Sequence, residues 1–424
     1  MRCCNIAAPV LILFMISFLI SGRVMPLQFL KQLPVQLVLS IILALFLGGI
    51  LDVQYISVGY TISSCFIEIL LFLLPLIIFN FIFRALINIK QGSFALVLLL
   101  FGAVTISNFL ALTIAYLFGT LTLPFFGVEH SSDFATNFSS SIETLFKFGF
   151  PQWISTEKAM MVGIVSGIVL SFFDENNKVK RIARDSSFWL SNKIGLFLGR
   201  VFIPLLPIYV FGFCIKLSYD DALVNLFQQY GRIFLLSMVL VVGYIFTLYF
   251  IASKSQIKLT LSQLKTMMPA GLTGFSTMSS AATMPVTLEC TETTTQDKDF
   301  ADLVIPFTAN IHMLGDDLTL IMTAMTLLSI FGMPWPDFTT FIPFALAFSM
   351  AKLSCVGLPG ASVLVILPVL QNYLGFTPEM ISILTTIYVL QDPFGTAANV
   401  MGNGAFALVT QRIINSLRKV VSVT

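Results

Sequence analysis

The chain has 424 residues, of which 57% are hydrophobic and only 10% charged, and its formal net charge is +2. Soluble domains carry about 25% charged residues. A chain with a mean hydropathy of +0.93 would expose large apolar patches in water, so a lipid bilayer is the solvent that fits it. The small net charge gives no support for nucleic acid as a partner.

An apolar segment opens the chain. Residues 5–21 are apolar and follow Arg2, which is typical of a signal or anchor sequence. If this segment crossed the membrane with its N-terminus in the cytoplasm, the basic residues that follow it would lie outside the cell. We therefore favour translation from Met25; removal of the segment, or an N-terminus outside, is the alternative. Residues 1–24 are thus expected to be signal- or anchor-like, or a mis-assigned start.

Eight later stretches reach the roughly 20 apolar residues that a membrane span needs. They are 33–51, 62–84, 96–118, 155–173, 186–215, 228–252, 300–330 and the less uniform 378–410. The fourth has an alternative start near residue 138, with a break from Gly149 to Pro151.

Two more stretches, 258–295 and 338–372, are interrupted in the middle by Pro, Gly and Ser. Each is expected to form two half-helices that enter and leave the membrane on one side. Eight spans and two re-entrant hairpins place the basic loops in the cytoplasm, in agreement with the positive-inside rule. The fold class expected is therefore an all-α integral membrane protein.

Small polar residues fill the middle of the first interrupted stretch. Residues 279–287 read Ser-Ser-Ala-Ala-Thr-Met-Pro-Val-Thr. Pro285 frees a carbonyl and is expected to open a helix N-terminus. Open backbone at membrane depth persists only where it is buried in protein or lines a wet cavity. The alternative is a tight helix–helix contact made by Ser and Ala.

One imidazole and two carboxylates, those of His312, Asp316 and Asp317, lie midway along the seventh span. Ionisable groups inside a span are costly, and they are functional candidates as cation ligands, proton carriers or partners of another buried charge. The alternative is that the two aspartates pair structurally with Lys352.

The second interrupted stretch turns at Gly357, Pro359 and Gly360, within residues 352–362. The run Gly-Leu-Pro-Gly cannot continue a helix. Its free amides suit a bound carboxylate, and a mobile turn suits a lid. The alternative is an ordinary surface turn, although its apolar flanks argue against one.

A polar stripe follows on the last span. Asp392, Thr396, Asn399 and Asn403 recur at spacings of four, three and four, so on a helix they share one face. The stripe alternatively faces another helix. Together with the interrupted stretches it favours a transporter, because discontinuous helices in corresponding elements mark a binding site near the bilayer midplane.

These residues resemble the sodium:dicarboxylate symporter family, which contains glutamate/aspartate and neutral amino-acid transporters. The resemblance covers roughly residues 30–412 and is strongest at 279–287 and at Gly-Leu-Pro-Gly-Ala, 357–361. It implies eight spans, two re-entrant hairpins, a homotrimer and elevator-type alternating access. The implied division is scaffold spans 1–2 in 25–95, transport span 3 in 96–118, scaffold spans 4–5 in 119–225, a transport core in 226–412 and a cytoplasmic tail in 413–424.

The resemblance also implies roles for single residues. Ser279 and Ser280 match positions that touch the substrate carboxylate, and Gly357 to Gly360, with Pro359, match the extracellular gate. Asp392 matches the carboxylate that holds the substrate amino group. Thr396 and Asn399 match further substrate contacts, and the Asn399 carbonyl matches a sodium ligand.

Three departures from the family pattern bear on substrate and ion. Leu314 and Asn403 replace two aspartates at sodium sites, and Gly395 replaces the arginine that holds an acidic side chain. A buried anion would lack its partner without that arginine. A neutral amino acid is therefore the expected substrate, with glutamate, aspartate or a dicarboxylate as the alternative.

Coupling by sodium or protons is expected despite the lost ligands. His312, Asp316 and Asp317, with Asn399 and Asn403, are the candidates for a shifted cation or proton site, and Lys352 for a tethered cation. The sequence thus predicts a cation-coupled amino-acid symporter in the bilayer of a bacterial inner membrane, without a cofactor or a metal other than sodium. An uncoupled channel-like or receptor-like homologue is the alternative.

An enzyme is not expected. Metal-dependent enzymes need several His or Cys ligands, and the two histidines, His130 and His312, are far apart in the chain. The six cysteines have no regular spacing, which argues against a metal site or a disulfide framework.

Overall fold

The computed structural model describes residues 33–87, 94–126, 142–151, 153–220, 222–355 and 360–421, and all regular elements within them are helical. The expectations for residues 1–24, and for Gly357 and Pro359, lie outside the described residues. The helices of the first half are α2 (Leu33–Gly48), α3 (Val53–Ile87), α4 (Phe94–Thr122), the short 3-10 helix η3 (Leu123–Phe126), α6 (Thr156–Ser171), α7 (Lys178–Phe197), the π-helical turn η4 (Leu198–Phe202) and α8 (Ile203–Tyr219).

The second half continues with α9 (Ala222–Ala252), α10 (Ile257–Thr277), α11 (Ser280–Thr295), α12 (Lys298–Thr308), α13 (Leu314–Ile330), α14 (Phe338–Lys352), α15 (Ala361–Leu374) and α16 (Pro378–Val421). Both interrupted stretches are pairs of helices, α10–α11 and α14–α15, whose members pack against each other. The seventh stretch is broken between α12 and α13. The two helix pairs confirm that both stretches are interrupted in the middle; that each enters and leaves the membrane on one side stays a prediction.

Helix length separates two groups among the expected spans. Among the residues that the structure describes, four helical segments are long and apolar enough to cross a membrane: Val53–Arg84, Leu99–Phe126, Lys178–Tyr219 and Tyr230–Ala252. The stretch 155–173 instead forms a helix of 16 residues, shorter than the roughly 20 that a perpendicular span needs, and the described part of the helix in 33–51 also has 16 residues. Exposed Leu235, Val239 and Val242 give α9 an apolar outer face, as lipid contact requires.

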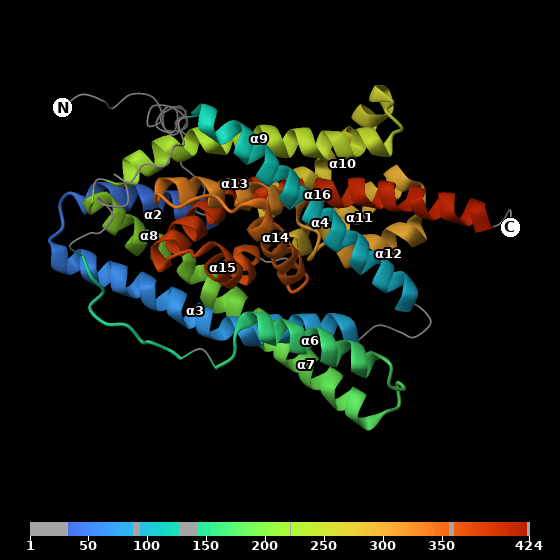
Figure 1. Cartoon of the computed structure of the whole chain (residues 1–424), viewed down its shortest axis with the longest axis horizontal. Helices are drawn as coiled ribbons and strands as arrows, with labels where there is room; N and C mark the ends of the chain where they lie inside the picture. The colour runs from blue at the N-terminus through green and yellow to red at the C-terminus, as the bar shows by residue number, and fades with distance from the viewer. Residues whose placement is uncertain are drawn as a thin grey trace, which may run out of the picture.

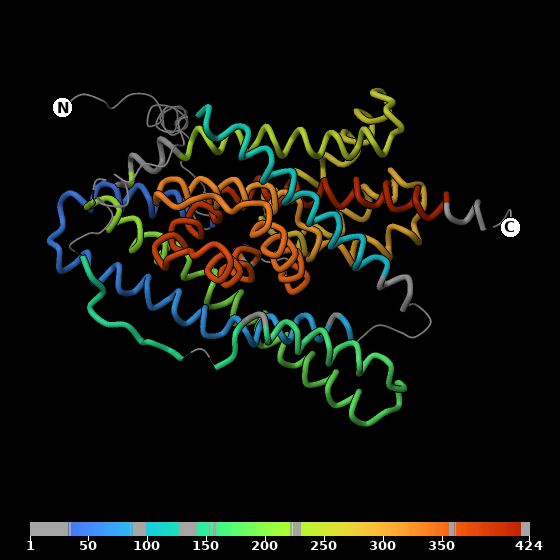
Figure 2. Tube along the Cα trace, in the orientation of Figure 1, coloured from blue at the N-terminus to red at the C-terminus, as the bar shows by residue number. Residues whose placement is uncertain are grey.

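The segment before α6 corrects the expected early start of the fourth span. Residues 142–151 are not helical, and they run along α3 (Figure 2). Their backbone donors bond to α3 instead: Leu145 N–H to Thr61 Oγ1 at 2.9 Å and Phe148 N–H to the Glu68 carboxylate at 2.8 Å. Gly149 has a φ of +59°, a left-handed conformation that a helix cannot contain. The helix begins only after the Ser155 cap.

Two sets of helices lie side by side in the molecule (Figure 1). In the first, α3 packs against α6, α7 and α8, and α2 packs against α8. In the second, α16 packs against α9, α10, α11, α12 and α13, while α4 packs against α13 and α14. An apolar cavity of about 320 Å³ separates α3 and α6 from α4 and the end of α14.

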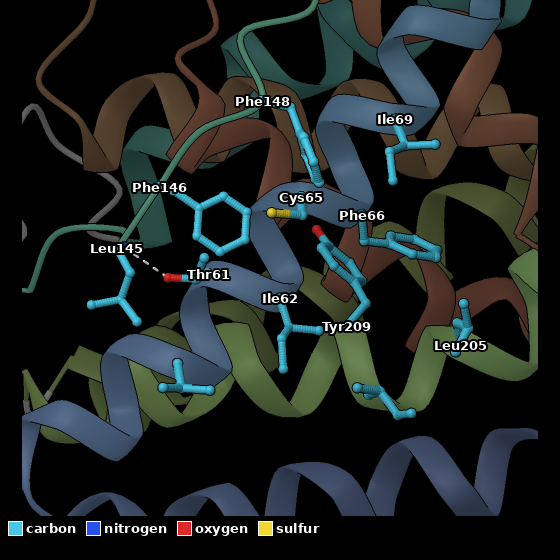
Figure 3. A pocket seen from close by; sticks show the side chains of 12 residues that line it. Thr61, Ile62, Cys65, Phe66, Ile69, Leu145, Phe146, Phe148, Leu205 and Tyr209 are labelled. Carbon is cyan, nitrogen blue, oxygen red and sulfur yellow. Dashed lines mark hydrogen bonds between the residues drawn. The ribbon is translucent and has the colours of Figure 1, made fainter.

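A second apolar cavity, of about 370 Å³, lies between α3, α8 and the segment 142–148 (Figure 3). Phe66 of α3 stacks on Tyr209 of α8 with ring centroids 5.2 Å apart. Tyr209 then donates to the Ser382 carbonyl of α16 at 3.1 Å, so this wall of the cavity reaches the second set of helices.

Candidate functional site

The turn between α10 and α11 is built from small polar residues. Met278 takes a left-handed conformation with a φ of +53°, and Ser279 caps α11 by accepting a hydrogen bond from Ala282 N–H at 3.2 Å. Ser279 and Ser280 are both buried. The helix thus opens at Ser280, which corrects the expectation for Pro285. That proline lies inside α11, where it removes one intrahelical hydrogen bond without ending the helix.

The break of the seventh stretch places two carboxylates at a helix start. Asp316 and Asp317 lie in the first turn of α13 and are at most 1% exposed. The partial positive charge of a helix N-terminus favours anions there.

Asp316 makes three hydrogen bonds with two residues of α16. Its Oδ1 accepts a hydrogen bond from Asn399 Nδ2 at 3.0 Å, and its Oδ2 accepts one from Tyr388 OH at 2.9 Å. Asp316 N–H donates in return to Asn399 Oδ1 at 3.2 Å. Gly395 makes room for this arrangement, because a Cβ atom at that position would lie 2.6 Å from Asp316 Oδ1.

Lys352 brings a positive charge to the two aspartates. It is fully buried in the last turn of α14, and its Nζ lies 3.7 Å from Asp316 Oδ2 and 3.6 Å from Asp317 Oδ1. Nζ also donates a hydrogen bond to Ser362 Oγ of α15. The pairing that the sequence left as an alternative is therefore present. Neither Asp317 oxygen accepts a hydrogen bond from the described residues.

Asp392 joins the second interruption to α16. Its Oδ2 accepts a hydrogen bond from Gly360 N–H at 2.9 Å, and its Oδ1 accepts one from Thr396 Oγ1 at 3.0 Å. Gly360 has a φ of +72° at the start of α15. The sequence predicted free amides at this turn; the amide of Gly360 instead donates to Asp392.

The predicted polar stripe divides into two networks. Asp392, Thr396 and Asn399 converge with Asp316, and Tyr388 links the two carboxylates, with its hydroxyl 3.5 Å from Asp392 Oδ1. Asn403 belongs to the other network, in which its Oδ1 lies 2.8 Å from His312 Nδ1.

The other ring nitrogen of His312, Nε2, lies 2.9 Å from Ser107 Oγ of α4. Because an amide oxygen only accepts, the hydrogen bond to Asn403 Oδ1 is donated by Nδ1, and Nε2 shares a hydrogen bond with the Ser107 hydroxyl. His312 is thus the centre of a network separate from the carboxylates.

Sequence reasoning missed three contributors: Tyr388, Ser107 and Ser362. Tyr388 lies four residues before Asp392 on the same helix face, so extending the stripe by one turn would have included it. Ser107 and its neighbour Asn108, which donates to the Ile311 carbonyl at 2.8 Å, are polar residues inside an apolar stretch. Ser362 is the last residue of the turn 352–362, where a bond to Lys352 requires the folded hairpin.

The arrangement brings together three buried carboxylates, one ammonium group and several hydroxyls at two helix interruptions. Such a site can bind a solute ammonium on Asp392. It can also hold small cations, because three carboxyl groups lie in the site and Lys352 is the cationic side chain beside them among the described residues. These are the tasks of a transporter's binding site.

Comparison with known proteins shows which family the chain resembles. The match to the family model of the sodium:dicarboxylate symporter family extends over residues 33–413. A serine/threonine transporter SstT of Acinetobacter baumannii strain AYE is 24% identical over 394 residues, covering 88% of this chain and 95% of that protein. The SstT of strain ATCC 17978 is 25% identical over 394 residues, which again cover 88% of this chain and 95% of that protein. The family match spans far more than half of the chain, so the chain belongs to the sodium:dicarboxylate symporter family and is a membrane transporter rather than an enzyme.

Proposed function

We propose that this symporter carries a small neutral amino acid together with a cation. The observation that carries the proposal is the carboxylate of Asp392, buried where α16 meets the start of α15. A solute ammonium fits there, because charge-assisted hydrogen bonds are the strongest that a buried site offers. The relatives are named as serine/threonine transporters, which favours a hydroxyl-bearing amino acid. The proposed solute contacts are Ser279, Ser280, Gly357, Pro359, Gly360, Asp392, Thr396 and Asn399.

The surroundings of Gly395 support a neutral solute side chain. Asp316 occupies the space that a side chain at position 395 would take, so the group closest to that position is a carboxylate. A second carboxylate on the solute would be buried beside Asp316 without a cationic partner of its own, because the ammonium group of Lys352 already faces Asp316 and Asp317, and an unpaired buried charge costs several kcal/mol. Neutral solutes with a hydroxyl avoid this cost.

Formal charge supports cation coupling. Counted as ionised, Asp316, Asp317 and Asp392 bring three negative charges against the one positive charge of Lys352. A zwitterionic solute adds no net charge, so cations that enter with it would lower the cost of burying the site. Sodium is the ion that the family's description names. We assign ion contacts to Asp316, Asp317 and Asn399, and a supporting role to His312 and Asn403.

We extend the proposal to topology and movement. Residues 25–95 and 119–225 form the scaffold, and residues 96–118 and 226–412 form a transport core of spans and two re-entrant hairpins that moves past it as an elevator. The packing of α3 with α6, α7 and α8 supports the division, as does the apolar cavity beside α4 and α14. A homotrimer in a bacterial inner membrane, with residues 413–424 on the cytoplasmic side, completes the proposal.

Uptake into proteoliposomes tests the function. Radiolabelled serine, threonine, alanine, aspartate and glutamate are offered under a sodium gradient, a proton gradient or neither. We expect serine and threonine to accumulate above the external concentration under a sodium gradient, and the two acidic amino acids to be excluded. Equilibration without accumulation under every gradient would contradict symport and identify a channel-like homologue.

A further inference from the structure

Lys352 occupies the end of a half-helix, next to the start of another. Nζ extends from the last turn of α14 toward the first turn of α13. The C-terminal end of a helix carries partial negative charge and favours a cation, whereas the N-terminal end of α13 favours its two carboxylates. In transporters built on discontinuous helices, the C-terminal ends of half-helices are where coupling cations are held. The ammonium group thus lies in a position suited to a mobile ion.

Asp317 shows what the ammonium group does there. The side chain is 0% exposed, and neither of its oxygens accepts a hydrogen bond from the described residues. Among the described residues, the cationic group next to the Asp317 carboxylate is Lys352 Nζ, which lies 3.6 Å from Asp317 Oδ1. A buried carboxylate with so few partners needs a counter-charge.

Asp316 has a different environment, although it shares the same lysine. Asn399 and Tyr388 both donate to its carboxylate, and Lys352 is 3.7 Å away. The hydrogen bond from Lys352 to Ser362 anchors the ammonium group to α15 as well. Three elements, α13, α14 and α15, therefore meet on one positive charge.

We propose that the ammonium group of Lys352 is a built-in cation that replaces one coupling sodium ion at Asp316 and Asp317. The inference rests on the proposed cation-coupled transport and specifies its stoichiometry. A tethered charge crosses the membrane with the protein and returns with it, so it adds no net charge to a full transport cycle. The protein therefore transports one sodium ion fewer per solute than it would with a neutral residue at position 352.

The test replaces the charge by a neutral side chain of similar length. In Lys352→Met, sodium takes the place of the ammonium group. We expect the charge moved per solute, measured from reversal potentials in proteoliposomes, to rise by about one. The Hill coefficient for sodium should rise in parallel. Lys352→Arg, which keeps the charge, and Lys180→Met, which removes a buried lysine in the first turn of α7, should keep the wild-type ratio. Accumulation by Lys352→Met with an unchanged ratio would overturn the inference.

A binding measurement covers a variant that folds poorly or does not transport. Purified Lys352→Met is melted in sodium chloride and in choline chloride of equal ionic strength. We expect sodium to raise its melting temperature more than that of the wild type. In Lys352→Met/Asp317→Asn the excess should disappear. A Lys352→Met protein that is equally unstable in both salts, while the double variant folds, would show that sodium cannot replace the lysine and would also overturn the inference. Failure of the wild type to accumulate any amino acid would contradict the proposed function instead.

Discussion

At the scale of single residues, the proposed solute binding depends on Asp392. Asp392→Asn keeps an oxygen that accepts from Gly360 N–H but loses the negative charge. A hydrogen bond to a charged group contributes about 1.5–3 kcal/mol, so we expect affinity for serine to fall about 10- to 100-fold in a thermal-shift titration. Asp337→Asn, at the exposed cap of α14, is the control and should leave affinity unchanged. Wild-type affinity in Asp392→Asn would remove Asp392 from the site.

Gly395 is required because of its neighbour. A methyl group at this position would lie 2.6 Å from Asp316 Oδ1, so Gly395→Ala should displace the carboxylate and weaken its bond to Asn399. Overpacking of this kind costs about 1–3 kcal/mol, which we expect as a lower melting temperature together with impaired uptake.

Gly243→Ala is the matched control for Gly395→Ala. No atom lies within 4 Å of a Cβ at position 243 in α9, so alanine should stabilise that helix by about 0.5–1 kcal/mol. Equal melting temperatures of the two alanine variants would show that Asp316 does not depend on the space at Gly395.

Much of the site could be predicted residue by residue, but its contacts could not. The spacing of Asp392, Thr396 and Asn399 places them on one helix face whatever the rest of the chain does. Asn403 lies one turn further along α16 and contacts His312 instead of the carboxylates. This contact depends on how α16 packs against the segment before α13, which the spacing alone does not determine. The Gly360–Asp392 bond likewise joins residues from two helices.

At the scale of elements, the turn between α6 and α7 provides a pH-dependent prediction. Glu175 is exposed and accepts a hydrogen bond from Lys180 Nζ at 2.8 Å, and this bond together with the charges of Lys180 and Arg184 lowers the pKa of Glu175. A carboxylate with a lowered native pKa stabilises the fold above its unfolded pKa, about 4.3. The contribution is lost as pH falls through the native pKa.

Glu175→Gln tests this linkage. We expect the variant to melt below the wild type at neutral pH, and the difference to close as the pH falls below about 4. Asp185→Asn, whose partner Arg184 is 3.9 Å away on the surface, should resemble the wild type throughout, because exposed pairs contribute little. A difference for Glu175→Gln that persists at low pH would point to a cause other than its charge.

Helix breaks were predictable where the residues themselves interrupt the backbone. Pro, Gly and Ser mark the middle of both hairpins, and the polar run from Thr308 marks the break before α13. The segment 142–151 was harder to predict, because its path depends on Thr61 and Glu68 of α3, about 80 residues earlier. The expectation that Pro285 opens a helix was wrong, because the cap at Ser279, rather than the proline, determines where α11 begins.

At the scale of the whole molecule, large apolar side chains lie on the outside as well as in the core, and a few ionisable groups are fully buried. Leu235, Val239 and Val242 of α9 are exposed, whereas Lys352, Asp316 and Asp317 are buried. Exposed apolar side chains on this scale are unusual for a water-soluble protein and fit a solvent that is itself apolar. The charge content of 10% is thus low overall but locally high where α13, α14 and α16 meet.

The hydrogen bond from Gly360 N–H to Asp392 has a consequence for binding kinetics. In the proposed site, this amide is held on the same chain and competes at high effective concentration with the solute's ammonium group for the Asp392 carboxylate. The apparent dissociation constant is then the intrinsic one divided by the fraction of time that Asp392 is accessible. Measured affinity and association rate therefore report on the hairpin's own opening equilibrium as well as on the solute's contacts.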